Sequence, residues 1–217
     1  YSTAALPAVR ALAAGDGSPL WRQAIAHRSN RPPAVDNGRI IGSGPGLLYC
    51  RDASDGKELW KIGNYSTYRA SVLLPDAALL NGNRLVSLSD GGDLRKLPMA
   101  GWDTYTDVAV SRDGALMVYG TPGGRGSPGM SLTALKLGDG SRLWSTPLES
   151  GAMSAPSLSR NFAWITTEDG MLRAVSLGDG KTVWSHSFGI RMESPIASGD
   201  GVFVAGDDGC VYALCAL

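Results

Sequence analysis

The sequence has no excess charge of either sign, few cysteines and no long hydrophobic run. Its 217 residues include 20 basic and 20 acidic side chains, so the formal net charge is zero. A chain without a basic excess has no electrostatic footprint for a nucleic-acid backbone, and we expect no nucleic-acid partner. No apolar stretch approaches the roughly 20 residues that a membrane-spanning helix needs, so we expect no membrane-spanning segment.

Residues that usually hold metals or perform catalysis are also scarce. The chain has three cysteines and two histidines. Cys50, Cys210 and Cys215 lack metal-ligand spacing, and we interpret them as small, buried apolar residues. His27 and His186 each lack a neighbouring set of ligands. The Asp-rich turns lack the spaced carboxylates and late glutamate of an EF-hand loop. The sequence therefore predicts neither a metal site nor a catalytic residue.

Turn residues are abundant, and they are arranged in a repeat. The chain has 29 glycines and 12 prolines. Four tryptophans follow Asp-Gly turns at spacings of 39, 84 and 40 residues: Trp21, Trp60, Trp144 and Trp184. Since the middle spacing is about twice the others, one repeat has lost its tryptophan, and residues 91–99 occupy its place. The period is about 41 residues.

The short apolar runs between these turns predict β-strands. Runs separated by Asp-Gly or Asn-Gly are typical of hairpins, and no window shows convincing helical periodicity. Each repeat holds four runs, and we place the third run at Val9, Leu47, Leu94, Leu132, Leu172 and Val211. Four-stranded antiparallel units repeated every 40 to 45 residues predict an all-β fold, a β-propeller with about five blades in this chain.

We expect one propeller domain over residues 1–217. In one interpretation the ring is small and closed, and the N-terminal segment 1–30 completes the last blade, residues 193–217. In the other, the chain is part of a larger propeller, and its terminal sheets need further chain or a partner to cover their edges. The start at Tyr1, without a leader-like pattern, predicts a mature or excised segment.

The repeat resembles the PQQ-like, or quinoprotein-type, β-propeller family. The closest matches to its strand, Asp-Gly turn and Leu-Trp pattern are residues 46–60 and 170–184. By this resemblance Trp21, Trp60, Trp144 and Trp184 are structural residues at the seams between blades. An indole buried at such a seam removes a large apolar surface from water, which favours a packing role for these tryptophans over a catalytic role.

The same resemblance implies two kinds of function. Quinoprotein dehydrogenases of this family hold pyrroloquinoline quinone (PQQ) and calcium on the propeller axis, but alcohol-oxidising members carry an adjacent cysteine pair, which this chain lacks. Non-catalytic bacterial members include the propeller lipoproteins of outer-membrane barrel assembly and the sensor propellers of Ser/Thr kinases. We therefore expect no cofactor, with PQQ and calcium as the alternative. An extracytoplasmic location, periplasmic or at the cell surface, follows from the resemblance alone.

The candidate binding residues lie in the loops that leave each outer strand and enter the next blade, because these loops converge around the channel. Tyr, Trp and Arg often anchor binding. Asp107 and Glu193 fall at nearly equivalent loop ends, where they could also form an acid and base pair. The candidates for a ligand or partner site are Arg28, Tyr65, Tyr68, Arg69, Trp102, Tyr105, Asp107, Met153, Arg191 and Glu193. The alternative is that these loops only pack over the blade ends.

From these observations we expect a non-catalytic binding, scaffold or sensor module whose axial loops hold a protein or peptide partner, or a small ligand. The alternative function is a PQQ- and calcium-dependent oxidoreductase or another propeller enzyme.

Overall fold

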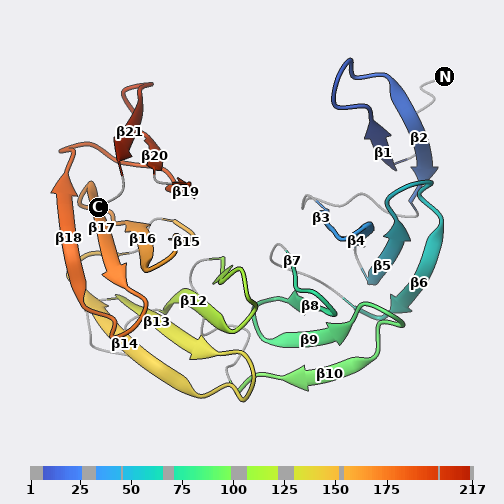
Figure 1. Ribbon diagram of the computed structural model, residues 1–217, viewed down its shortest axis with the longest axis horizontal. Coiled ribbons are helices and arrows are strands. Elements are labelled where there is room, and N and C mark those ends of the chain that lie inside the picture. Colours follow the sequence, from blue (N-terminus) through green and yellow to red (C-terminus); the bar gives the residue numbers. More distant parts are fainter. Residues whose placement is uncertain are drawn as a thin grey trace. The chain divides into compact units, whose positions relative to one another are not determined.

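The fold is all-β in a computed structural model of the chain, which describes residues 7–25, 33–44, 46–65, 71–98, 107–121, 130–151, 154–199 and 201–215. Within these ranges the secondary structure consists of 21 strands, and no helix is present. The strands form antiparallel sheets of neighbours in sequence (Figure 1). The predicted all-β fold of four-stranded units is thereby confirmed.

The chain divides into two compact units, residues 1–96 and 97–217, and each is described by itself. The first unit holds a two-stranded sheet followed by two four-stranded sheets. The two-stranded sheet is β1 (Ala8–Leu12) and β2 (Pro19–Ala24). The next is β3 (Ala34–Asp36), β4 (Arg39–Gly44), β5 (Leu47–Asp52) and β6 (Glu58–Gly63). The third is β7 (Val72–Leu73), β8 (Ala77–Leu80), β9 (Arg84–Ser87) and β10 (Asp93–Lys96).

The second unit holds two four-stranded sheets and a three-stranded one. The first sheet is β11 (Ala109–Val110), β12 (Leu116–Thr121), β13 (Met130–Lys136) and β14 (Arg142–Leu148). The second is β15 (Ser157–Leu158), β16 (Phe162–Thr166), β17 (Met171–Ser176) and β18 (Thr182–Ser187). The third is β19 (Ile196–Ser198), β20 (Gly201–Ala205) and β21 (Val211–Cys215).

Asn-Gly turns explain two of the hairpins directly. Asn37 and Gly38 between β3 and β4 have φ of 46° and 72°, and Asn81 and Gly82 between β8 and β9 have φ of 51° and 74°. Two successive residues with positive φ match the twist of antiparallel strands, and asparagine and glycine accept that conformation most readily. The sequence therefore encodes these turns locally.

One strand assignment made from the sequence is wrong. Leu94 lies on β10, the outer fourth strand of its sheet, whereas the third strand is β9. Without a tryptophan to mark the outer strand, the two patterns cannot be distinguished. Leu94 instead corresponds to Leu59 and Leu143, because all three side chains are exposed and lie on outer strands.

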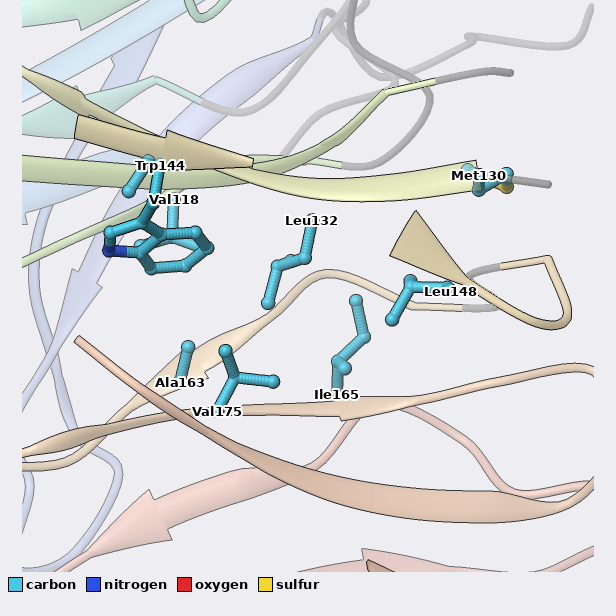
Figure 2. Close-up of a cluster of buried hydrophobic side chains, with 9 residues drawn as sticks. Val118, Met130, Leu132, Trp144, Leu148, Ala163, Ile165 and Val175 are labelled. Atoms are coloured by element: carbon cyan, nitrogen blue, oxygen red, sulfur yellow. The ribbon is translucent and has the colours of Figure 1, made fainter. Parts of the chain in front are cut away.

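The core of each unit lies between successive sheets. In the second unit, Val118, Leu132 and Trp144 of one sheet face Ala163, Ile165 and Val175 of the next (Figure 2). These six are at most 9% exposed. In the first unit, β3–β6 packs in the same way on β7–β10. Full burial of one large aliphatic side chain stabilises by about 1.5–3 kcal/mol, so these inter-sheet layers account for much of the stability.

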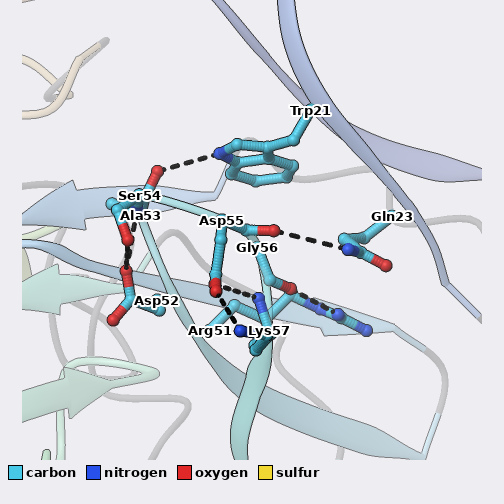
Figure 3. A network of polar contacts seen from close by, with 9 residues as sticks. All are labelled: Trp21, Gln23, Arg51, Asp52, Ala53, Ser54, Asp55, Gly56 and Lys57. Carbon is cyan, nitrogen blue, oxygen red and sulfur yellow. Dashed lines mark hydrogen bonds and ion pairs between the residues drawn. The ribbon is translucent and has the colours of Figure 1, made fainter.

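Three tryptophans make the same joint between neighbouring sheets. The indole Nε1–H of Trp21, Trp60 and Trp144 donates to the carbonyl of Ala53, Leu88 and Leu177, respectively, at 2.9–3.0 Å. Each acceptor follows the third strand of the next sheet, and the glycine three residues later lies under the indole ring. Figure 3 shows the Trp21 joint, where Gln23 also donates to the Asp55 carbonyl.

Two of the three cysteines are exposed, whereas the sequence predicted that all three are buried. Cys50 is buried, but Cys210 and Cys215 are exposed free thiols. Both belong to the end of the chain around β21, and the register places Cys215 opposite Gly201, on the sheet face that also carries exposed Phe203. The sequence pattern alone did not reveal that this sheet face is uncovered. Completion of the last blade by residues 1–30 stays a prediction.

Candidate functional site

The candidate loops fall at one end of each sheet. In an antiparallel four-stranded sheet, the connection that leaves the outer strand lies at the same end as the turn between the second and third strands. Tyr65, Asp107, Arg191 and Glu193 lie in such connections. The remaining candidates lie outside the described residues: Arg28, Tyr68, Arg69, Trp102, Tyr105 and Met153. His27 lies outside them as well.

Arg191 and Glu193 project from a segment that is fixed on both sides. Met192 between them is fully buried and packs in the core of β15–β21, whereas the two charged side chains are exposed. The Glu193 N–H donates to the Ala205 carbonyl at 2.8 Å, and the Asp207 N–H donates to the Arg191 carbonyl at 3.1 Å. The segment thus presents a cation and an anion, two residues apart, on an anchored backbone.

The turn of the neighbouring sheet holds this segment from the other side. Thr166 Oγ1 donates to the Glu193 carbonyl at 3.1 Å, and the Phe188 N–H donates to the Gly170 carbonyl at 3.0 Å. A Cβ on Gly170 would lie 2.4 Å from the Ile190 carbonyl oxygen, and the φ of Gly170 is +75°. Only glycine fits there, so the close approach of the two loops depends on this residue.

Two acidic residues at this end were not among the sequence candidates. Glu168 follows β16 and lies against Gly151, and its N–H donates to the Gly151 carbonyl at 2.9 Å. Asp207 follows β20 beside the Arg191 backbone. Both occupy turns between second and third strands, which share this end of the sheets. Extending the search from the outer-strand loops to these turns would have found them.

Tyr65 is placed differently from the other described candidates. It is 7% exposed and packs in the core between β3–β6 and β7–β10. The Arg84 guanidinium lies over its ring at 4.8 Å from the centroid, and a bidentate ion pair with Asp93 orients Arg84. Burial raises the pKa of Tyr65, and the hydrogen bonds from Arg84 lower the pKa of Asp93. The ring is therefore enclosed by protein.

Asp107 is the last of the described candidates, and His186, which was not a candidate, lies among aromatic side chains. Asp107 is partly exposed just before β11 and makes interactions within the protein. His186 stacks on Trp184 and meets Phe188 edge-on, at centroid distances of 5.9 and 4.7 Å.

Among the described residues, no three His, Cys, Asp or Glu side chains are arranged to hold a metal. Likewise, that part of the chain contains no helix long and apolar enough to cross a membrane.

The four-stranded antiparallel units, their Asp-Gly turns and the tryptophan joints define a protein of the PQQ-like β-propeller class. A family model described as "Outer membrane protein assembly factor BamB" matches residues 7–101 and 78–216. The chain belongs to this family.

Two curated relatives carry the same description. The factor from Burkholderia pseudomallei is 28% identical over 233 residues, which covers 98% of this chain and 59% of the relative. The factor from Moranella endobia is 27% identical over 178 residues, which covers 72% of this chain and 44% of the relative. The chain thus spans about half the length of these proteins.

Solved structures support the fold. The crystal structure of BamB from Moraxella catarrhalis superposes with a TM-score of 0.67 at 17% identity, covering 95% of this chain and 66% of that one. The computationally designed Ika8 protein superposes with a TM-score of 0.71 at 16% identity, covering 92% and 62%. At these identities the likeness concerns the fold.

Proposed function

We propose that the chain is a non-catalytic scaffold module that binds a protein partner during outer membrane protein assembly, outside the cytoplasm. The observation that carries the proposal is the family match over nearly the whole chain, together with two curated relatives that are outer membrane protein assembly factors. The partner surface is the end of the sheets that carries Arg191 and Glu193.

The geometry around Arg191 suits recognition of a polar partner segment. Arg191 and Glu193 are exposed, and their backbones are fixed by hydrogen bonds to β20 and to the turn after it. A preorganised segment loses little conformational entropy when it binds, which favours affinity. Arginine is also among the residues that most often dominate interface energy.

Site-specific photo-crosslinking in a Gram-negative bacterium tests this surface. A photoreactive residue replaces Arg191 in the exported chain, and a matched control replaces Lys181, which is exposed in the turn between β17 and β18 at the opposite end of the sheet. We expect adducts with components of outer membrane protein assembly from position 191 and not from position 181. Equal adducts from both positions, or none from 191, would refute the proposal.

Calorimetric titration with PQQ and calcium tests the alternative function. We expect no saturable heat from the purified chain. Saturable binding at micromolar concentration or below would overturn the non-catalytic assignment and would justify a screen for alcohol and sugar oxidation.

A further inference from the structure

Two Asn-Gly pairs occupy hairpin turns of the first unit, and both have the sequence that favours loss of the asparagine amide. Asn37-Gly38 connects β3 to β4, and Asn81-Gly82 lies between β8 and β9. Asparagine is chemically labile because the backbone nitrogen of the next residue can attack its side-chain carbonyl carbon. Glycine has no Cβ, so its nitrogen approaches most easily. The sequence alone does not distinguish the two pairs.

The structure exposes the first pair and encloses the second. Both residues of the first pair are exposed, whereas Asn81 is partly buried and Gly82 is buried. Leu80, just before the second pair, is fully buried in the core between β3–β6 and β7–β10. The Asn83 N–H donates to the Leu80 carbonyl at 3.1 Å and closes this turn. Attack at Asn81 therefore requires a buried turn to open.

The exposure of Asn37 belongs to the place of its turn in the repeat. The turn between the first and second strands is also exposed in β7–β10, β11–β14 and β15–β18, at residues 75–76, 112–113 and 160–161. The same hydrogen bond recurs in these turns: the Gly38 carbonyl accepts from the Ala53 N–H at 2.8 Å, and the Asn161 carbonyl accepts from the Leu177 N–H at 2.9 Å. This turn is thus exposed in successive sheets, whichever sheet faces are covered.

The residue before Asn37 holds it in place. The Asn37 backbone N–H donates to Asp36 Oδ1 at 2.9 Å, and Asn37 Nδ2 donates to Asp36 Oδ2 at 3.3 Å. Residues 36–38 are all exposed, so opening of this turn breaks these bonds without uncovering a core side chain. Local opening needs the least free energy where few apolar contacts are lost. The turn at Asn37 therefore opens more often than the turn beside Leu80.

We propose that Asn37 is a site of spontaneous deamidation in the folded chain, and that Asn81 is protected from it. The Gly38 nitrogen forms a bond with Asn37 Cγ, and the bond between Cγ and Nδ2 breaks. The Nδ2 nitrogen leaves as ammonia and carries away the proton that the Gly38 nitrogen loses. Water then opens the cyclic imide at either carbonyl and gives aspartate or isoaspartate, without any transfer of electrons. The proposal does not depend on the partner surface around Arg191.

The modification lies next to a joint between two sheets. Arg39 follows the turn, and its Nη1 donates to the Leu88 carbonyl at 2.7 Å, which also accepts from Trp60. Deamidation adds a negative charge beside Asp36, and isoaspartate also adds a methylene group to the main chain. Because neighbouring like charges repel, both products weaken the turn that positions Arg39.

Incubation at mildly alkaline pH followed by peptide mass spectrometry tests the proposal, because the attacking nitrogen must lose a proton. The folded chain is compared with the chain in guanidinium chloride. In the folded chain Asn37 should react at least about tenfold faster than Asn81, because opening of the second turn also exposes Leu80, and burial of such a side chain shifts an equilibrium by about tenfold or more. In denaturant the two pairs should react at similar rates, since only folding distinguishes them.

Asn161 is the matched control for exposure without glycine. It is exposed in the corresponding turn of β15–β18, but Phe162 follows it, and the Cβ of phenylalanine hinders the attack. Asn161 should therefore react more slowly than Asn37 in both conditions. Asn37→Gln is the matched variant, because it keeps the carboxamide on a longer side chain that closes the imide ring far less readily. Isoaspartyl methyltransferase should label the aged wild-type chain much more than the aged variant, and circular dichroism confirms that the variant is folded.

Four results would overturn the proposal. The first is an Asn37 peptide that keeps its mass in the folded chain but reacts in denaturant. The second is an equal rate at Asn37 and Asn81 in the folded chain. The third is a rate at Asn161 as high as that at Asn37, which would contradict the role of glycine. The fourth is equal labelling of the wild-type chain and the Asn37→Gln variant, which would place the isoaspartate elsewhere.

Discussion

Alanine at Gly180 should weaken the joint between β11–β14 and β15–β18 by more than the turn conformation alone explains. Gly180 has φ of +74°, and a Cβ there would lie 2.8 Å from Trp144 Cδ2 and 2.8 Å from Thr146 Oγ1. The left-handed conformation costs an alanine about 1–2 kcal/mol. Overpacking against the indole adds about 1–3 kcal/mol. The expected loss in the free energy of unfolding is therefore about 2–5 kcal/mol.

Gly209→Ala is the matched control in the same unit. Gly209 has φ of +78°, but nothing lies within 4 Å of a Cβ built on it. In this variant the free energy of unfolding should fall only by the cost of the left-handed conformation, about 1–2 kcal/mol. Urea denaturation followed by tryptophan fluorescence measures both variants, and the Gly180→Ala spectrum should also report the displaced indole. Equal losses in the two variants, within about 0.5 kcal/mol, would refute the idea that glycine is needed because the tryptophan lies against it.

Two further predictions concern single interactions. Trp144→Phe keeps a ring at the seam but leaves the Leu177 carbonyl without the indole N–H that now reaches it at 2.9 Å; we expect a loss of about 1–3 kcal/mol in urea denaturation, and an unchanged midpoint would contradict the role of this bond. Asp93→Asn removes the ion pair with Arg84, whose hydrogen bonds lower the pKa of Asp93 in the folded chain. A lowered folded-state pKa gives stability that is present above the unfolded value of about 3.9 and is lost as the pH falls through the folded-state value. The small difference between wild type and variant at pH 7 should therefore shrink as the pH falls below the unfolded value of about 3.9, and a difference that stays constant over the acidic range would contradict the assignment.

The fold was predictable because its signals are local. Asn37-Gly38 and Asn81-Gly82 encode hairpin turns through positive φ, and the short apolar runs of β16 and β17 encode strands that are buried on both faces. Each signal is repeated with the same spacing, so one repeat supports the interpretation of the next. The error at Leu94 occurred where the repeat lost its tryptophan.

The candidate site was less predictable, because exposure is not a local property. Arg191 and Glu193 are exposed, whereas Tyr65, from an equivalent loop, lies in the core under Arg84. Arg84 and Asp93 come from β9 and β10, and nothing in the pattern near Tyr65 indicates that they cover it. Glu168 and Asp207 were missed for a related reason, since only the strand connectivity places their turns at the same end as the outer-strand loops.

The sequence by itself determined the strands, the turns and the repeat, because short-range preferences for φ and for alternating burial act within a few residues of chain. Only the tertiary structure decided which side of each sheet is covered. Val211 and Leu172 occupy matching positions in their sheets, yet one is 70% exposed and the other is fully buried. The difference is the presence of a neighbouring sheet, and burial of apolar area against a neighbour depends on what lies across the interface.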